Sequence, residues 1–325
     1  MTGGAGYIGS HAVRELLDAG HEVRVLDDLS QGHRAAVPAG AALHVADLSD
    51  RDRVRLALDR VEAVIHFAGV LNVGESVAEP LLYWRVNVSK GLALLDAMAA
   101  AGVARIIFSS TCATYGMPVT IPMDEAHPQE PINPYGASKR AFERALQDLA
   151  AAGALRAVAL RYFNAAGCHP DGSLGEHHRP EIHLIPLAID AALGRRPPLT
   201  IFGDDYDTPD GTCVRDYIHV QDLARAHVQA LEALERGGAF RVFNLGTERG
   251  ASVREVVQAV ERASGRLVPT ALGPRRPGDP ARLVAGAARA RAELGFAPRF
   301  LDLGGIVETA FRWRRDHPRG YASAA

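Results

Sequence analysis

The chain has 325 residues, of which 47% are hydrophobic and 23% charged, and its formal net charge at pH 7 is −2. This length predicts about two domains, and the small net charge argues against nucleic acid or an anionic membrane as a partner. Three cysteines without a CxxC pair indicate neither a disulfide framework nor a zinc site. No export signal or membrane-length apolar run is present, so we expect a cytoplasmic protein that binds small molecules.

A glycine-rich stretch, TGGAGYIGSH, opens the chain with Gly3, Gly6 and Gly9 at intervals of three. Such a loop normally follows a buried strand and leads into a helix whose N-terminal amides hold a pyrophosphate. Only Met1 and Thr2 precede the glycines here, whereas a buried strand takes about five residues. We therefore expect a truncated first strand, and either poor folding or a gap at the centre of the sheet.

Residues 7 to about 164 alternate apolar runs with amphipathic segments, which is typical of a doubly wound parallel sheet. The expected strands cover residues 21–27, 41–45, 63–69, 105–110 and 156–163. The expected helices cover residues 7–20, 50–60, 80–101 and 135–152. Residues 1–164 are therefore predicted to form a Rossmann-type α/β domain.

The second half, residues 165–325, contains loops rich in Gly, Pro, His and Asp between shorter elements. Helices are predicted at residues 183–194, 221–236, 252–264 and 303–316, and short strands at 199–202 and 240–245. This half is expected to be a smaller α/β substrate domain, from which some elements can return to the first. A ligand cleft is expected between the two.

An acidic residue supports a dinucleotide site in the first half. The strand predicted over residues 21–27 ends in Asp27, 18 residues after Gly9, where the ribose-binding acid of a dinucleotide fold belongs. A carboxylate there accepts hydrogen bonds from the ribose and repels a 2′-phosphate, and Asp28 adds to the repulsion. NAD is therefore favoured over NADP; the alternative is that Asp27 only caps a turn.

A pair of residues with catalytic spacing follows in NPYGASKR, where Tyr135 and Lys139 lie four apart on a predicted helix and so face the same way. A phenol with a reference pKa of about 10 is a poor base, but nearby positive charge makes it a usable proton acceptor. Ser109 and Thr111 follow a predicted strand whose carboxyl end borders the ligand crevice. Either can hydrogen-bond a sugar hydroxyl or the tyrosine oxygen. The alternative is that both hydroxyls only stabilise the turn.

Seven passages together resemble the UDP-glucose 4-epimerase branch of the extended short-chain dehydrogenase/reductase family. They are TGGAGYIGSH, IHFAGVLNVGES, FSSTCATYG, INPYGASK, LRYFNAAG, LTIFGDDYDTPDGTCVRDYIHV and RRPGDPARLV. The likeness runs from Gly3 to about Tyr321. It implies a UDP-galactose and UDP-glucose interconversion through a transient 4-keto sugar and bound NAD, by a homodimer.

The resemblance also implies roles for individual residues. Those implied to hold the cofactor are Gly3, Gly6, Tyr7, Ile8, Gly9, Asp27, Asp47, Phe67, Ala68, Gly69, Asn87, Tyr135 and Lys139. Tyr135 is the implied base, Lys139 is implied to adjust the pKa of Tyr135, and Thr111 is the implied hydroxyl partner. The residues implied to bind the UDP-sugar are Ser109, Thr111, Asn164, Arg215, Arg276, Asp279 and Leu283.

Two positions depart from the pattern of some family members. Leu71 stands where certain epimerases place a lysine near the cofactor, and Leu283 stands where a bulkier tyrosine limits the sugar pocket. The smaller leucine leads us to expect a side activity on UDP-N-acetylhexosamines.

Two rival functions remain open at this point. A nucleotide-sugar dehydratase or decarboxylase uses the same fold, but related enzymes tend to carry an acidic residue in the loop that reads TCATYG here. A non-catalytic NAD-binding protein would commonly lose Tyr135 or Lys139. No metal site is expected, because Glu176, His177 and His178 lack ligand spacing, and His219 is expected to be a packed or hydrogen-bonded histidine.

Overall fold

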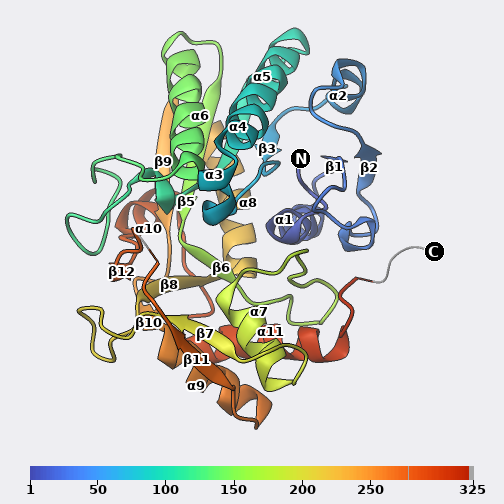
Figure 1. Cartoon of the computed structure of the whole chain (residues 1–325). Coiled ribbons are helices and arrows are strands. Elements are labelled where there is room, and N and C mark those ends of the chain that lie inside the picture. Colours follow the sequence, from blue (N-terminus) through green and yellow to red (C-terminus); the bar gives the residue numbers. More distant parts are fainter. Residues whose placement is uncertain (277, 322–325) are drawn as a thin grey trace.

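The structure, a computed structural model, describes residues 1–276 and 278–321. Figure 1 shows two parts, one with α5 and α6 beside the long strands and the other with α7, α9 and α11 around a second group of strands. The helix bounds are α1 (Tyr7–Asp18), α2 (Arg51–Ala57), α3 (Val73–Ala78), α4 (Pro80–Tyr83), α5 (Lys90–Ala100), α6 (Pro134–Ala151), α7 (Leu184–Ala192), α8 (Val220–Glu235), α9 (Val253–Ser264), α10 (Ala288–Leu294) and α11 (Leu303–Asp316). None of these helices combines the length and the apolarity that crossing a membrane requires.

A parallel sheet forms the core of the first part, as the alternating pattern predicts. Its strands are β1 (Arg24–Asp27), β2 (Ala42–Val45), β3 (Val64–His66), β4 (Arg105–Thr111), β5 (Arg156–Tyr162) and β9 (Phe240–Leu245). β3, β4, β5 and β9 pair in that order, β1 pairs with β2, and all of these pairings are parallel. The expected Rossmann-type α/β fold is confirmed.

The start of the chain bridges the centre of this sheet. Thr2 forms parallel bridges to Leu26 in β1 and to His66 in β3. Its amide donates to Ile65 O at 3.0 Å, and its carbonyl accepts from Phe67 N at 2.9 Å. The expected gap between β1 and β3 is therefore bridged at Thr2, because Met1 and Thr2 form backbone hydrogen bonds to these two strands.

The predicted helix over residues 80–101 is divided into consecutive segments. α4 leads into a π-helical turn, η2 (Trp84–Ser89), which continues as α5. Two short 3-10 turns, η1 (Arg34–Ala36) and η3 (Cys112–Thr114), follow β1 and β4. The π-helical turn buries Asn87, and π-bulges of this kind often occur at functional sites.

The second part is built on a smaller set of strands. They are β6 (Asn164–Ala166), β7 (Leu199–Phe202), β8 (Val214–His219), β10 (Gly250–Ser252), β11 (Thr270–Gly273) and β12 (Arg282–Leu283). β8 pairs in parallel with β6 and β12 and antiparallel with β10, while β7 pairs with β11. Helices α7, α9 and α11 pack on one another and share an apolar cluster that includes Ile189, Val260 and Phe311.

Three elements late in the chain return to the first part. β9 pairs with β5 along its length, α8 packs on α1, and α10 packs on β9. Apolar residues of α1, β5, α8 and α10 therefore share one cluster, which includes Val13, Val158, Leu223 and Ala290. The strand expected at residues 240–245 thus exists but completes the first sheet.

Candidate active site

The glycine-rich loop is shaped by close backbone contacts. Gly3 has φ +71°, and a Cβ there would lie 2.6 Å from Ala68 N, while a Cβ at Gly9 would overlap the carbonyl oxygen of Gly3. α1 begins after Gly6, which offers no side-chain cap, so the first amides of the helix are free to bind an anion. The loop therefore fits a pyrophosphate that approaches the bare backbone.

Asp27 lies at the end of β1 and faces this loop. Its Oδ2 accepts a hydrogen bond from Ala5 N and its Oδ1 accepts one from Leu29 N, both at 2.9 Å. Burial raises the pKa of Asp27, and the two amide bonds oppose that rise. Each carboxylate oxygen keeps a second lone pair, so Asp27 can still accept from ribose hydroxyls.

Asp47 pairs with one of the chain's two lysines. The Nζ of Lys90, the first residue of α5, contacts Asp47 Oδ2, and Ser49 N donates to Asp47 Oδ1 at 2.8 Å. Desolvation opposes ionisation, but the bonds from Lys90 and Ser49 prevail and lower the pKa of Asp47 to about 2. The sequence analysis named Asp47 but did not predict Lys90 as its partner.

The segment that follows β3 connects the cofactor loop to α6. Asn87 Oδ1 accepts from Val70 N at 2.9 Å, and its Nδ2 donates to Ser138 Oγ at 3.0 Å. A Cβ at Gly69 would lie 2.8 Å from Asn87 Oδ1 and 3.4 Å from Lys139 Nζ. Phe67, Ala68, Gly69 and Asn87 thus lie between the glycine loop and the predicted catalytic pair.

Tyr135 lies in the first turn of α6. The helix starts there because Pro134 occupies its first position and Asn133 caps it, accepting from Gly136 N at 2.8 Å. Burial raises the pKa of Tyr135 above its usual range, nearby Tyr162 raises it further, and a hydrogen bond with the Thr111 side chain lowers it. Thr111 therefore lies close enough to Tyr135 to act on its pKa, and its role as the hydroxyl partner stays a prediction.

Lys139 is buried one turn further along α6. Its Nζ donates to Ser109 O at 3.1 Å and lies 4.9 Å from the centre of the Phe108 ring. Burial lowers the pKa of Lys139 to about 8, and the charge of Glu143 opposes this. Lys139 is thus held against the carboxyl end of β4, beside the segment that contains Gly69.

Tyr162 is a site residue that sequence reasoning missed. Its hydroxyl shares a hydrogen bond with Ser109 Oγ, and its proximity raises the pKa of Tyr135. Tyr83 also faces Tyr135 edge-on, with ring centres 6.3 Å apart. A signal was available for Tyr162, because it ends β5 at the same edge of the sheet as Ser109 and Thr111.

Basic and acidic side chains meet in the second part. Arg215 Nη2 contacts Asp279 Oδ1, and the Arg276 guanidinium lies 4.1 Å from the centre of the Phe202 ring. All three residues act on the pKa of the Cys213 thiol, so they lie in the same region. These are the arginines and the acid predicted to bind the UDP group.

The remaining substrate positions lie on the strands next to Arg215. Asn164 in β6 pairs with Tyr217 in β8, and Leu283 in β12 pairs with Arg215 itself. Leu283 and Cys112, the residue directly after Thr111, both pack against the apolar cluster that includes Phe163 and Tyr115. Leu283 therefore lies where the two parts meet. Leu71, the other departure, is 45% exposed.

His219 is packed and hydrogen-bonded, as the sequence analysis expects: its ring stacks on Phe300 with centres 3.7 Å apart, and its Nε2 lies 3.0 Å from Thr309 Oγ1.

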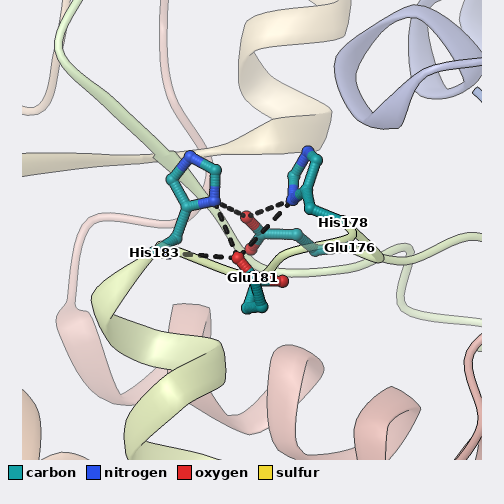
Figure 2. A group of neighbouring side chains, drawn as sticks. All are labelled: Glu176, His178, Glu181 and His183. Carbon is teal, nitrogen blue, oxygen red and sulfur yellow. Dashed lines mark hydrogen bonds and ion pairs between the residues drawn. The ribbon is translucent and has the colours of Figure 1, made fainter. Parts of the chain in front are cut away.

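The acidic and histidine-rich segment differs from the expectation. His177 turns away and stacks on His33. Glu176 and His178 instead converge with Glu181 and His183, and one ligand atom from each of the four lies within 4.8 Å of the others (Figure 2). The spacing argument considered only three consecutive residues, so it did not include Glu181 and His183.

Comparisons with known proteins identify the family of the chain. Residues 1–246 match the NAD dependent epimerase/dehydratase family. The UDP-glucose 4-epimerase of Azospirillum brasilense is 53% identical over 317 residues, which are 97% of this chain and 91% of that protein. The structure resembles UDP-glucose 4-epimerase from Bifidobacterium longum in complex with NAD⁺ and UDP, with a TM-score of 0.94 and 39% identity over 98% of both chains. It also resembles the UDP-Glc/GlcNAc 4-epimerase of Campylobacter jejuni, with a TM-score of 0.84 and 42% identity over 97% of this chain and 98% of that one. The chain therefore belongs to the UDP-glucose 4-epimerase family.

Proposed function

We propose that this chain interconverts UDP-galactose and UDP-glucose, with NAD held throughout the reaction. The observation that carries the proposal is the group of Tyr135, Thr111 and Lys139 beside the glycine loop, in which Thr111 and Lys139 are buried. The relatives named above, one of which has NAD⁺ and UDP bound, support the same reaction.

The residues around the loop fit NAD. The uncapped start of α1 accommodates a pyrophosphate, and side chains at Gly3, Gly9 or Gly69 would fill or distort the cradle. Asp27 would accept from the ribose and Asp47 would lie on the adenine side. When bound, NAD supplies a reversible hydride acceptor for the fourth carbon of the sugar, and its oxidised ring adds positive charge near the tyrosine.

Tyr135 acts as the base that removes the proton of the sugar's 4-hydroxyl. The Thr111 hydroxyl donates to the phenolate, and the Lys139 ammonium adds positive charge on the same face of α6. The proton returns from Tyr135 when the 4-keto sugar is reduced on its other face.

The second part of the chain holds the substrate by its UDP end. Arg215 and Arg276 provide guanidinium forks for diphosphate oxygens, while Asp279 orients Arg215. Held only at this end, the 4-keto sugar is free to turn over between the two hydride transfers. This arrangement inverts the fourth carbon without net oxidation.

The dehydratase or decarboxylase reaction is less well supported. Expulsion of water from neighbouring carbons needs an additional acid and base, whereas the 3-10 turn η3 after Thr111 presents Cys112, Ala113 and Thr114. Burial raises the pKa of Cys112 to about 12, so it is a poor proton donor or acceptor there. A 4-keto-6-deoxy sugar as the product would establish this alternative.

We also infer a side activity on UDP-N-acetylhexosamines from Leu283. This side chain is paired opposite Arg215 and packs near Cys112, so its size limits the space beside the sugar. Leu283→Tyr should lower kcat/KM for UDP-N-acetylglucosamine more than for UDP-galactose. No turnover of UDP-N-acetylglucosamine by the unaltered chain would end this proposal.

We further propose that the protein is a cytoplasmic homodimer. Leu81, Trp84 and Leu92 are exposed apolar residues at helical spacing along α4, η2 and α5, so a second copy can cover them. Light scattering should give the mass of a dimer, and Leu81→Glu should shift it toward the monomer. A monomeric mass for the unaltered chain at micromolar concentration would contradict the proposal.

We also propose that different elements of the chain bind the cofactor and the substrate. Residues 1–164 with α8, β9 and α10 would bind NAD, and the other elements of residues 165–325 would bind the UDP-sugar. The pairing of β9 with β5 supports this assignment.

The direct test of function is incubation of the purified protein with UDP-galactose and separation of the products by chromatography. We expect UDP-glucose as the only product. The final ratio of UDP-glucose to UDP-galactose should be the same whichever of the two starts the reaction. A different product from the sugar nucleotide would overturn the proposed reaction.

A further inference from the structure

Four side chains that the proposed reaction does not use converge in the segment between β6 and α7. They are Glu176, His178, Glu181 and His183, and Figure 2 shows both imidazole Nδ1 atoms facing the two carboxylates. Glu176 is 3% exposed, and His183, directly before α7, is the most exposed at 31% of its side chain. The group is therefore largely closed to solvent.

The spacing of these ligand atoms matches a metal site. His183 Nδ1 lies 2.9 Å from Glu176 Oε1 and from Glu181 Oε1. His178 Nδ1 lies 3.5 Å and 3.6 Å from the same two oxygens. Zinc bonds of about 2.0 to 2.1 Å in a tetrahedron put neighbouring ligand atoms about 3.3 Å apart, which is within the range of these four distances.

Several polar atoms at the centre of the cluster lack hydrogen bonds in the described structure. They include both carboxylate oxygens of Glu176, His178 Nδ1 and Glu181 Oε2. Glu176 Oε1 is close to His183 Nδ1, but the two atoms do not have hydrogen-bond geometry. A buried carboxylate without donors is costly, so these atoms point to a ligand among them.

Charge supports a cation as that ligand. The two carboxylates carry two negative charges, and neutral imidazoles leave them unbalanced. The nearest guanidinium, Arg314, is engaged with Asp190 through Nε at 2.8 Å, and its Nη1 lies 3.7 Å from Glu181 Oε2. A divalent ion with two neutral histidines would make the group neutral.

We propose that Glu176, His178, Glu181 and His183 bind one divalent transition-metal ion, with Zn²⁺ as the best fit. Imidazole nitrogen and carboxylate oxygen are both zinc ligands, and four protein ligands are typical of a structural site. Softer thiolate ligands are not needed. None of the four residues is among those assigned to the proposed epimerase reaction.

The position of the cluster gives the ion a structural role. The His178 ring meets the Tyr7 ring edge-on with centres 6.0 Å apart, and Tyr7 Oη donates to Gly167 O at 2.5 Å. Tyr7 starts α1, while Glu176 to His183 lead into α7. A metal ion would therefore fix the segment against which the start of α1 packs.

The test uses the full chain, freed of metal by dialysis against a chelator. Zn²⁺ is added in competition with a chromogenic chelator, bound zinc is counted by elemental analysis, and thermal unfolding is followed with and without the ion. One zinc per chain with micromolar or tighter affinity, and a higher Tm with zinc, are expected. Mn²⁺ and Mg²⁺ should bind more weakly.

Variants test whether the bound zinc lies in this cluster. His178→Gln and Glu181→Gln should each weaken zinc binding at least tenfold and abolish the zinc-dependent rise in Tm. His177→Gln is the matched control, because His177 is adjacent in sequence but stacks on His33, and it should bind zinc like the unaltered chain.

The opposite results would overturn the proposal. Absence of stoichiometric zinc in the unaltered, folded chain would mean that protons on the histidines balance the carboxylates instead. Binding that survives both His178→Gln and Glu181→Gln would place the ion elsewhere. Folding of the variants is checked by circular dichroism, so that loss of structure is not mistaken for loss of a ligand.

Discussion

The ammonium of Lys139 donates a hydrogen bond to the carbonyl oxygen of Ser109, 3.1 Å away, inside the protein. This contact fixes the first turns of α6, which contain Tyr135, against the carboxyl end of β4, which contains Thr111. The proposed base, its proposed hydroxyl partner and the buried positive charge therefore depend on one helix and one strand.

Replacement of Lys139 by Met should lower kcat by about a hundredfold or more, because the positive charge that favours the Tyr135 phenolate is lost. Burial lowers the pKa of Lys139 to about 8 from 10.5, so between these pH values the unfolded chain binds more protons. The free energy of unfolding of the wild type should therefore rise relative to that of Lys139→Met between pH 8 and 10.5. Urea denaturation at several pH values measures this, and a difference that is constant with pH would contradict it.

The buried ion pair of Glu143 and Arg161 should be important for stability. Arg161 Nε donates to Glu143 Oε1 at 3.0 Å and Nη2 donates to Oε2 at 2.5 Å, while Arg161 Nη1 donates to Tyr115 Oη at 2.9 Å. Glu143→Gln leaves the guanidinium charge buried without a partner, which should cost about 3 to 5 kcal/mol in the free energy of unfolding.

A control for that variant lies on the same helix. Arg144 pairs with Asp148 on the exposed face of α6, and Arg144→Ala should leave the urea midpoint essentially unchanged. Equal losses of stability in the buried and exposed variants would show that the buried pair has no special role.

The glycine loop predicts a specific loss of cofactor. A Cβ at Gly9 would overlap Gly3 O, so Gly9→Ala should displace the loop from the pyrophosphate, and NAD should no longer co-purify. Gly74→Ala is the control, because a Cβ there meets its nearest atom at 3.5 Å, an ordinary contact. NAD released by heat and measured by absorbance reports both variants; stoichiometric NAD in Gly9→Ala would refute the assigned loop.

His227 makes the fold sensitive to acid. Burial lowers the pKa of His227 from 6.5 to about 4, so between these pH values the unfolded state binds a proton that the folded state does not. Stability should fall as the pH drops from 6.5 to 4, and His227→Leu should reduce that slope by about 1.4 kcal/mol per pH unit. Urea unfolding across this range measures the slope, and identical slopes in the two proteins would contradict the account.

Local pattern was sufficient for much of the fold and part of the site. α1, α6 and α9 lie close to their predicted ranges because their apolar residues repeat at helical spacing and Asn133 and Ser252 cap the last two. Tyr135 and Thr111 could be connected from the sequence because Thr111 comes at the end of a predicted strand that borders the crevice and Tyr135 begins the next predicted helix.

Features that depend on distant contacts were not predictable in the same way. No periodicity in residues 240–245 shows that β9 pairs with β5, and the fit of Met1 and Thr2 between β1 and β3 depends on both neighbours. Glu181 and His183 were missed as partners of Glu176 because only the folded loop turns their side chains toward it.

The most direct test of the central claim compares the unaltered chain with Tyr135→Phe, both purified without added NAD and incubated with UDP-galactose. Bound NAD is measured in each, and UDP-glucose is quantified by chromatography. We predict that both proteins contain NAD, that the unaltered chain forms UDP-glucose, and that Tyr135→Phe forms it at least a hundredfold more slowly. Equal rates in the two proteins, or no product from an unaltered chain that contains stoichiometric NAD, would contradict the account.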